Sequence, residues 1–241
     1  MTDFTNQVAV LTGASSGIGK AIASGLAAKG ATLCLVGRDF DELEHLSASI
    51  QKSSTRFQPC VVDLGLDDDI KKLRKCIEND FGHLDILIHC AGAISLGPVE
   101  SARISDFDLQ YRINVRAPYL LTQALLPLLK TRKGQIAFIN SSVGLISKKD
   151  LSQYAATKHA LKAFTDSLRE EVNEMGIRVL SVYPGRTATQ MQEMIFGWEG
   201  KDYPPDRLLQ PQDVAAVVIH SLSLPRTAEV TDINIRPMAK V

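Results

Sequence analysis

Two side chains in the second half of the chain have the types and the spacing for acid–base chemistry. Tyr154 and Lys158 lie four residues apart in a stretch, 152–175, that we expect to be a helix. Residues at this spacing share one helix face, so the ammonium group would lie near the phenol. A free tyrosine titrates near about 10, and a neighbouring cation favours its deprotonated form. The pair therefore predicts a tyrosine that gives a proton to a forming alkoxide or takes one from an alcohol.

A glycine-rich turn near the N-terminus has the composition of a phosphate-binding loop. It reads TGASSGIG over 12–19 and follows a short apolar segment, 7–12, that we expect to be a strand. Glycines allow the main chain to approach a pyrophosphate, and the free N–H groups of the next helix, 17–29, face the same anion. The dinucleotide contacts that we expect in this turn come from Gly13, Ser15, Ser16, Gly17, Ile18 and Gly19.

The end of the second expected strand, 32–36, bears on which dinucleotide is bound. Such units normally offer a carboxylate to the adenosine ribose at this point. Here Gly37 offers no side chain, and Arg38 follows it. A guanidinium suits a 2′-phosphate as a charged, bidentate partner, which favours NADP(H) over NAD(H). In the alternative, Arg38 is a solvated charge and Asp39 reaches the ribose, although Asp39 is equally suited to cap the following helix.

The overall composition excludes several classes of partner. The chain has 241 residues, of which 45% are hydrophobic and 22% charged, and 27 basic residues balance 27 acidic ones. A zero formal charge without a run of Lys or Arg gives no electrostatic basis for binding nucleic acid or an anionic membrane. The N-terminus lacks a secretory signal pattern, and the most apolar long stretch, 119–129, is too short to span a bilayer. We therefore expect a cytoplasmic location.

The four cysteines show no paired spacing that would mark a disulfide framework or a metal site. They are Cys34, Cys60, Cys76 and Cys90. Three of them lie in apolar, strand-like runs, so small buried thiols are the interpretation that we favour, with a disulfide or metal site as the alternative. We predict no bound metal.

Segments typical of strands and of helices alternate along the whole chain and would position these groups. The expected strands are 7–12, 32–36, 57–62, 84–89, 135–140, 177–182 and 232–235. The expected helices are 17–29, 39–51, 67–81, 104–112, 118–130, 152–175 and 211–223. Several strands are continuous apolar runs, which is typical of a parallel sheet covered on both faces. The pattern predicts an α/β protein: one Rossmann-type domain over 1–241, with a doubly wound parallel sheet flanked by helices.

The least regular segment, 186–210, follows the sixth expected strand. Ligands of such folds bind beyond the carboxyl ends of the strands, so this segment is a candidate substrate loop, with an ordinary surface loop as the alternative. Its apolar side chains would either line an apolar site or pack the loop or an oligomer contact; they are Met191, Met194, Ile195, Phe196 and Trp198.

Taken in order, these motifs resemble those of the short-chain dehydrogenase/reductase family over nearly the whole chain. The glycine pattern T-G-x-x-x-G-x-G, the S-x-x-G stretch from Ser141, the Tyr154–Lys158 pair and the P-G-x-x-x-T-x-M stretch carry the resemblance. It implies a catalytic set of Asn114, Ser141, Tyr154 and Lys158. Ser142 is the alternative to Ser141, but it lies twelve rather than thirteen residues before the tyrosine. By resemblance, the serine holds the substrate oxygen and the asparagine holds a water that leads protons to the lysine.

The resemblance also implies cofactor contacts at the ends of the other strands. Asp63 would contact the adenine, and the lysine would hold the ribose. Thr187 and Thr189 would hold the carboxamide of the nicotinamide. The chain departs from the family where His89 and Cys90 replace two asparagines, and we expect His89 to be a packed strand-end residue rather than a catalytic one. The implied contacts are Asp63, Leu64, Cys90, Ala91, Gly92, Tyr154, Lys158, Pro184, Gly185, Thr187 and Thr189.

The function implied by the resemblance is that of an NADP(H)-dependent oxidoreductase acting on a small carbonyl or alcohol. An enoyl reductase is one alternative, disfavoured by the Tyr–Lys interval of four. A cofactor-binding sensor or scaffold is another, disfavoured by the complete catalytic set. Relatives are often dimers or tetramers through their long helices, so we expect a homodimer or homotetramer. The ending at 233–238 resembles a subset of relatives that act on small alcohols and hydroxy acids.

Overall fold

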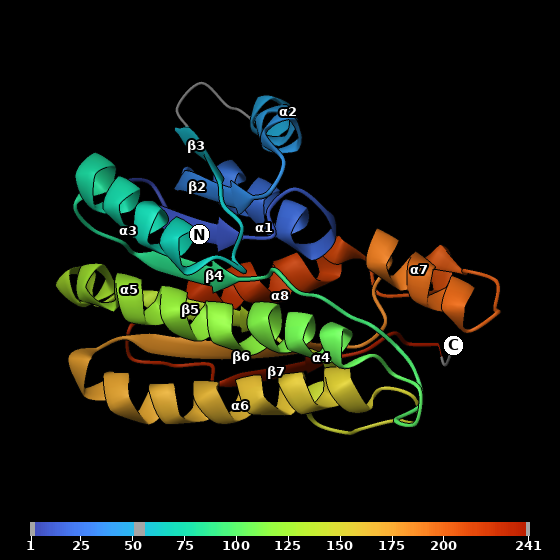
Figure 1. Ribbon diagram of the computed structural model, residues 1–241. Coiled ribbons are helices and arrows are strands. Elements are labelled where there is room, and N and C mark those ends of the chain that lie inside the picture. The colour runs from blue at the N-terminus through green and yellow to red at the C-terminus, as the bar shows by residue number, and fades with distance from the viewer. Residues whose placement is uncertain (1–2, 51–55, 240–241) are drawn as a thin grey trace.

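The computed structural model describes residues 3–50 and 56–239, which form one seven-stranded sheet flanked by helices (Figure 1). All neighbouring strands pair in parallel, in the order β3-β2-β1-β4-β5-β6-β7. Because the order runs outward in both directions from β1 and β4, the predicted doubly wound sheet is confirmed. The strands are β1 (Val8–Thr12), β2 (Thr32–Gly37), β3 (Phe57–Val61), β4 (Ile86–His89), β5 (Gln135–Ile139), β6 (Arg178–Pro184) and β7 (Asp232–Ile235).

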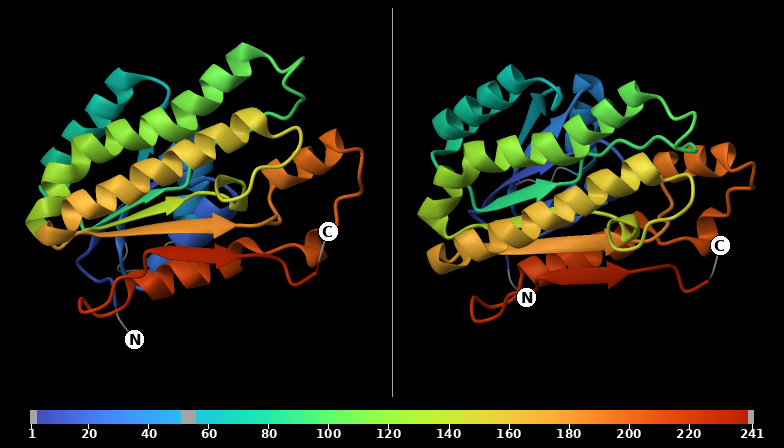
Figure 2. Two further views of the ribbon diagram at one scale, coloured as in Figure 1. Left: turned by 90° about the horizontal axis from the view of Figure 1, so that it is seen from below. Right: turned by 60° about the horizontal axis from the view of Figure 1, so that its bottom comes forward.

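Helices cover both faces of this sheet, as the right-handed crossovers between parallel strands require (Figure 2). On one face, α1 and α8 pack on each other and on the strands, whereas α3, α5 and α6 cover the other face. The helices are α1 (Gly17–Ala28), α2 (Phe40–Ile50), α3 (Asp67–Phe81), α4 (Ile104–Tyr111), α5 (Ala117–Arg132), α6 (Ser152–Val172), α7 (Gln190–Trp198) and α8 (Pro211–Leu222).

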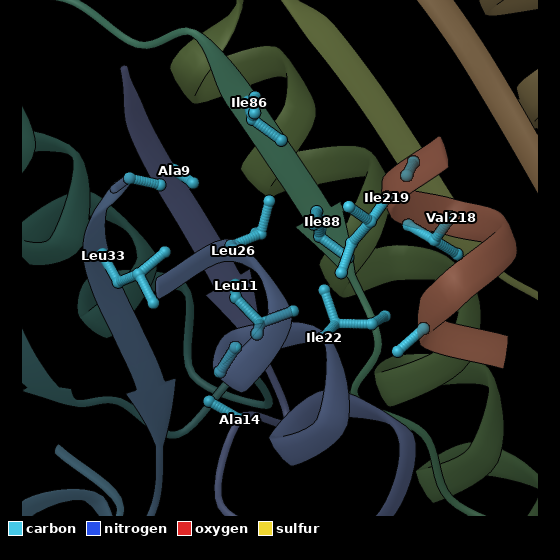
Figure 3. Close-up of a cluster of buried hydrophobic side chains, with 14 of the residues drawn as sticks. Ala9, Leu11, Ala14, Ile22, Leu26, Leu33, Ile86, Ile88, Val218 and Ile219 are labelled. Carbon is cyan, nitrogen blue, oxygen red and sulfur yellow. The ribbon is translucent and has the colours of Figure 1, made fainter. Parts of the chain in front are cut away.

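The core between α1, α8 and the sheet follows from apolar spacing in the sequence. Ile22 and Leu26 lie four residues apart on α1, Val218 lies on α8, and all three are buried against β1 and β4 (Figure 3). Figure 3 shows these side chains meeting Leu11 and Ile88 from the two central strands. Removing one such side chain down to alanine typically costs about 2–5 kcal/mol. This core fixes the end of β1, and with it the glycine-rich turn.

Two helical features differ from what the sequence predicts. Residues Arg112–Arg116 form a π-helical turn that joins α4 to α5 without a break, where we expected two separate helices. The segment 186–210 contains helix α7, which stands beyond the carboxyl ends of the strands (Figure 1). Its residues are Gln190–Trp198, and they include Gly197, which weakens the local helical signal. A bridge between Thr187 and Leu209 closes the base of this segment.

The cysteines are free thiols, and no group of side chains in 3–50 and 56–239 has the arrangement of a metal site. The Sγ atoms of Cys34 on β2 and Cys60 on β3 lie 3.2 Å apart, a proximity that the sequence spacing does not reveal. Within the same described ranges, no helix has the length and apolar character needed to cross a lipid bilayer.

Candidate active site

Tyr154 lies in the first turn of α6, and its hydroxyl meets the serine that follows β5. The Ser141 hydroxyl lies close enough to the phenol to lower its pKa, and it accepts the N–H of Val143 at 3.2 Å. That second contact caps the short 3₁₀ turn Ser142–Gly144 and fixes the orientation of Ser141. The structure therefore brings Ser141, rather than Ser142, to the tyrosine.

The environment of Tyr154 sets its protonation state. Burial raises the pKa of Tyr154 to about 12, and the nearby Ser141 hydroxyl opposes part of that rise. We expected the neighbouring lysine to favour the phenolate, but in this structure the desolvation of the phenol dominates. The Lys158 ammonium lies 5.7 Å from the centroid of the tyrosine ring. Tyr154 is therefore a neutral proton donor in this state of the protein.

Lys158 is enclosed one turn further along α6, with only 3% of its surface exposed. Burial lowers its pKa to about 8, and a nearby thiol, Cys90, acts weakly in the opposite direction. Its ammonium donates to the carbonyl of Ile139 at 3.3 Å. A lysine with this pKa exchanges protons near neutral pH, as a proton relay requires.

Asn114 is buried in the π-helical turn between α4 and α5. Its amide exchanges two hydrogen bonds with the main chain of Ala93, both at 2.8 Å, and donates to the Thr157 hydroxyl at 3.0 Å. The asparagine thus ties the strand that follows β4 to the helix that carries Tyr154 and Lys158. The wide turn is what directs this side chain inward, a common use of π turns at functional sites.

Asn140 belongs to this cluster but was missed by the sequence interpretation. Its side-chain amide donates to the carbonyl of Lys158 at 3.1 Å, and its main-chain N–H donates to the carbonyl of Val182 on β6 at 2.8 Å. The position directly before Ser141 was the only sequence signal for it. Because Ile139 and Asn140 hold the ammonium and the main chain of the same lysine, the end of β5 fixes Lys158 at two points.

The glycine-rich turn has the close main-chain packing that a dinucleotide site needs. Gly13 has φ +66° and a Cβ there would lie 2.8 Å from the main chain of Ala91, while a Cβ at Gly19 would lie 2.0 Å from the Gly13 carbonyl. The Thr12 hydroxyl accepts the N–H groups of Cys90 and Ala91 at 3.1 and 3.2 Å, which holds the ends of β1 and β4 together. These residues fit a nicotinamide dinucleotide, because the packed glycines keep the start of α1 open to a pyrophosphate.

A short run after β4 connects this turn to the catalytic groups. A Cβ added at Gly92 would lie 3.5 Å from the Asn114 amide oxygen and 4.0 Å from the Lys158 ammonium. The glycine is exposed, so the main chain here borders both the glycine-rich turn and Lys158. A ligand extended across the strand ends would therefore meet the two sites in succession.

The ends of β2 and β3 place the remaining expected dinucleotide contacts at the far end of the same edge. Asp39 accepts the N–H of Glu42 at 3.1 Å and so caps α2, whereas Arg38 is exposed and makes no hydrogen bond or ion pair within the described chain. Asp63 accepts the N–H of Gly65 at 2.8 Å, and Leu64, beside it, is half-buried. These four side chains do not contact the catalytic set.

Thr187 and Thr189 connect the end of β6 to α7. Thr187 is buried and donates to the Gly185 carbonyl at 3.1 Å, while Thr189 caps α7 by accepting the N–H of Gln192 at 3.2 Å. The methyl group of Thr189 lies 2.9 Å from where a Cβ on Gly17 would stand. The start of α7 therefore packs directly against the glycine-rich turn, and Pro184, the last residue of β6, precedes this contact.

His89 is a packed core residue, as expected from its place at the end of β4. Its ring stacks on Phe138 with centroids 4.6 Å apart, and Nε2 lies 2.9 Å from the Thr122 hydroxyl. Burial lowers its pKa to about 3, so the ring is neutral at physiological pH. It makes no contact with the catalytic side chains.

A hollow of about 430 Å³ lies beside the loop between β3 and α3. An ion pair between Arg116 and Asp67 forms part of its wall, and it shares no residue with the catalytic set. The buried titratable side chains of Tyr154 and Lys158 lie instead beside the carboxyl end of β5. The residues that line the hollow are Gly65, Asp67, Asp108, Tyr111, Arg112 and Arg116.

Comparisons with known proteins agree with this arrangement. Residues 7–200 match the family model described as short chain dehydrogenase. The chain is 33% identical to an uncharacterized oxidoreductase of Staphylococcus epidermidis over 239 residues, which are 99% of this chain and 100% of that protein.

Two solved structures show the same fold. An alcohol dehydrogenase of the archaeon Thermococcus sibiricus, complexed with 5-hydroxy-NADP, superposes with a TM-score of 0.88 at 25% identity and 98% coverage of both chains. The L-sorbose reductase of Gluconobacter frateurii, complexed with NADPH and L-sorbose, gives 0.87 at 27% identity, covering 97% of this chain and 96% of that one.

The fold and the site define an oxidoreductase of the kind that uses a nicotinamide cofactor. The chain belongs to the short-chain dehydrogenase/reductase family.

Proposed function

We propose that this protein is an NADP(H)-dependent oxidoreductase that interconverts a small carbonyl compound and its secondary alcohol. The observation that carries the proposal is the buried Tyr154 hydroxyl, which meets Ser141 and lies one helical turn from Lys158. A neutral phenol held in this way is suited to protonate a forming alkoxide.

The choice of NADP(H) rests on the end of β2. Arg38 stands exposed at the carboxyl edge, and the rival acceptor Asp39 is engaged in capping α2. A free guanidinium at this point suits a 2′-phosphate. Two similar structures were solved with forms of NADP, which supports the same choice. The pyrophosphate would lie on Gly13, Gly19 and the start of α1, with the nicotinamide end near Thr187.

The chain's own residues then carry the proton chemistry. When bound, NADPH supplies a hydride to the substrate carbon. Ser141 donates a hydrogen bond to the substrate oxygen and so stabilises its developing charge. Tyr154 transfers its phenolic proton to that oxygen. Lys158 then returns a proton to the Tyr154 phenolate oxygen. Asn114 holds the main chain at Ala93 and the Thr157 hydroxyl in place around this relay.

We propose a small molecule as the partner of the site, in a cytoplasmic protein without nucleic-acid or membrane partners. We also propose a homodimer or homotetramer through the long helices. Exposed apolar side chains on α4 and α5 support this proposal, since a second copy would remove them from water. They are Leu109, Tyr111 and Tyr119.

Oxidation of NADPH and of NADH by the purified protein tests the proposal. The panel contains ketones, aldehydes, β-keto acyl thioesters, keto acids, quinones and an enoyl thioester, with the Tyr154→Phe variant as the control. We expect NADPH-selective reduction of a carbonyl that the variant loses while it still binds NADPH. Normal turnover by Tyr154→Phe would refute the proton-transfer role, and reduction of the enoyl thioester alone would assign a C=C reductase.

The 2′-phosphate contact is tested separately with the Arg38→Ala variant. Loss of a charged, bidentate hydrogen bond typically costs about 1.5–3 kcal/mol, so NADPH should bind about ten- to hundred-fold more weakly. NADH should bind almost unchanged. An equal loss for both cofactors would contradict the assignment of Arg38.

A further inference from the structure

Arg186, the second residue after β6, carries a buried donor that nothing in the described chain satisfies. Its Nη2 donates to Glu199 at 2.5 Å, and the guanidinium stacks over Phe196 with its carbon 4.6 Å from the ring centroid. Its Nη1 atom is buried and has no hydrogen-bond partner among the described residues. Buried polar atoms are nearly always hydrogen-bonded, so a donor of this kind marks a place where an acceptor is missing.

A second unsatisfied donor lies on the same side of α7. Gln192 is 9% exposed, and its Nε2 atom is buried without a partner in the described chain. Gln192, Phe196 and Glu199 are spaced four and three residues apart, so they share one helix face. The Arg186 guanidinium lies along this face, over the phenyl ring in its middle.

This face of α7 points toward the body of the protein rather than toward solvent. Phe196 is buried, whereas Met194 and Trp198, on the other side of the helix, are 52% and 54% exposed. The two unsatisfied groups are both donors, and both therefore call for an acceptor on the ligand.

The carboxylate that faces Arg186 has a second cationic partner. Glu199 is the carboxylate that faces Arg186, and its second oxygen accepts from Lys201 at 3.0 Å. Burial opposes the ionisation of Glu199, but the hydrogen bonds from these two cations outweigh it and hold its pKa below the usual value. Glu199 is shared between two cations, so Arg186 does not have this carboxylate to itself.

Arg186 also leaves the sheet next to the catalytic serine. β5 and β6 are neighbouring parallel strands, with Ile139 facing Val182, and Ser141 and Arg186 follow their respective ends. Parallel strands lie about 4.8 Å apart, so the two residues emerge from the same edge on adjacent strands. The Leu209 N–H donates to the Arg186 carbonyl at 3.1 Å, which fixes the main chain at this point.

We propose that Arg186 and Gln192 form a carboxylate-binding subsite on the inner face of α7, so that the preferred substrate is an oxo acid or the corresponding hydroxy acid. The inference rests on the proposed function, since the carbonyl of that acid would be reduced at Ser141 and Tyr154. Arg186 supplies a charged donor, Gln192 a neutral one, and the Phe196 ring supports the plane of the guanidinium. Both residues determine specificity and take no part in proton transfer.

Matched acids and esters test this assignment. We would compare kcat/KM for 2-oxohexanoate, 4-oxohexanoate and 5-oxohexanoate with their methyl esters, which keep the carbonyl but lose the charge. At least one acid should exceed its ester by about ten- to hundred-fold, as expected for a buried charged hydrogen bond. Arg186→Met should bring that ratio close to one, and Gln192→Leu should reduce it by about three- to tenfold.

Lys201→Met is the matched control. Like Arg186→Met, it removes one positive charge that pairs with Glu199. Lys201 is exposed and does not reach the buried donors, so the acid-to-ester ratio should stay at the wild-type value. A ratio that falls equally in Lys201→Met and Arg186→Met would overturn the subsite, because general electrostatics would then explain it. Esters that match or exceed every acid in the wild-type protein would also overturn it.

A binding measurement separates this inference from the proposed function. Trp198 on α7 is the single tryptophan of the chain, so its fluorescence reports on this helix alone. Hexanoate should give a saturable change that hexanamide does not give, with and without NADP⁺, and Arg186→Met should weaken it by about tenfold or more. The absence of a hexanoate response, or an equal response in the folded Arg186→Met variant, would overturn the subsite. Failure of every carbonyl to turn over, with the hexanoate response intact, would contradict only the proposed reaction.

Discussion

Replacing Lys158 with methionine should make the protein more stable at neutral pH while abolishing turnover. The ammonium is almost completely buried, and burial lowers its pKa from 10.5 to about 8. At about 1.36 kcal/mol for each tenfold change in proton affinity, keeping this charge inside costs about 3 kcal/mol at pH 7. Methionine fills a similar volume without the charge, although it leaves the Ile139 carbonyl without its donor, at a cost of about 1 kcal/mol. The expected net gain is about 2 kcal/mol.

The pH dependence of this gain has a definite sign. A lysine whose pKa is lowered by folding binds its proton more tightly in the unfolded chain, so it penalises the folded state most at low pH. The penalty is complete below pH 8, shrinks as the pH rises, and vanishes above pH 10.5, where the amine is neutral in both states. The stability difference between Lys158→Met and the wild-type protein should follow the same course.

Urea unfolding at pH 7 and at pH 9.5 measures this difference. At pH 7 the variant should also melt about 4–8 °C higher, given about 2–4 °C for each kcal/mol in a chain of this length. Lys162→Met is the matched control on the same helix, because Lys162 is partly exposed and paired with Asp166 and should give no such gain. A Lys158→Met variant that is no more stable at pH 7, or whose advantage does not narrow at pH 9.5, would refute the reasoning.

Three further substitutions probe other parts of the site. Gly19→Ala would place a Cβ 2.0 Å from the Gly13 carbonyl and so disturb the glycine-rich turn. Fluorescence titration should then show NADPH binding weakened by at least about tenfold, and unchanged binding would contradict this expectation. Asn140→Ala removes the donor to the Lys158 carbonyl; kcat should fall about tenfold at an unchanged NADPH affinity, and an unaltered kcat would show that this hydrogen bond does not position the lysine. His89→Asn removes a group whose pKa is lowered by folding from 6.5 to about 3. Because this histidine binds a proton more tightly in the unfolded chain, the wild-type protein loses stability as the pH falls below 6.5. Relative to its own stability at pH 7, the variant should retain about 3 kcal/mol more than the wild-type protein at pH 4.5 in urea unfolding, and parallel losses would contradict the buried neutral histidine.

The sheet and most helices could be predicted because their signals are local. Continuous apolar runs indicated the buried parallel strands, and the spacing of Ile70, Leu73 and Ile77 indicated α3 at its observed bounds. Each of these patterns depends only on which residues face the core. Helix α7 was missed because Gly197 and the surrounding loop residues give little local preference, so its position depends on tertiary contacts such as Phe196 with Tyr203.

The candidate catalytic residues were predicted from a resemblance, whereas their environment needed the structure. The sequence placed Tyr154 and Lys158 on one helix face but could not give the burial that raises one pKa and lowers the other. Asn140 escaped notice because its role depends on a contact with α6, eighteen residues away in sequence. The capping of α2 by Asp39, one of two options open from sequence, was likewise decided by main-chain geometry.

The π turn at 112–116 also determines what happens when a residue is deleted between α4 and α5. A π turn accommodates one residue more than an α-helical turn would, so the direction of Asn114 depends on the residue count between α4 and α5. Deleting a single residue there would let the two helices merge into one regular helix that still presents the buried face of α5 to the sheet, because the π turn holds the one extra residue. The exposed Arg112 and Arg116 should therefore accept many substitutions, whereas a deletion beside them would carry Asn114 out of the site and leave the rest of the molecule folded.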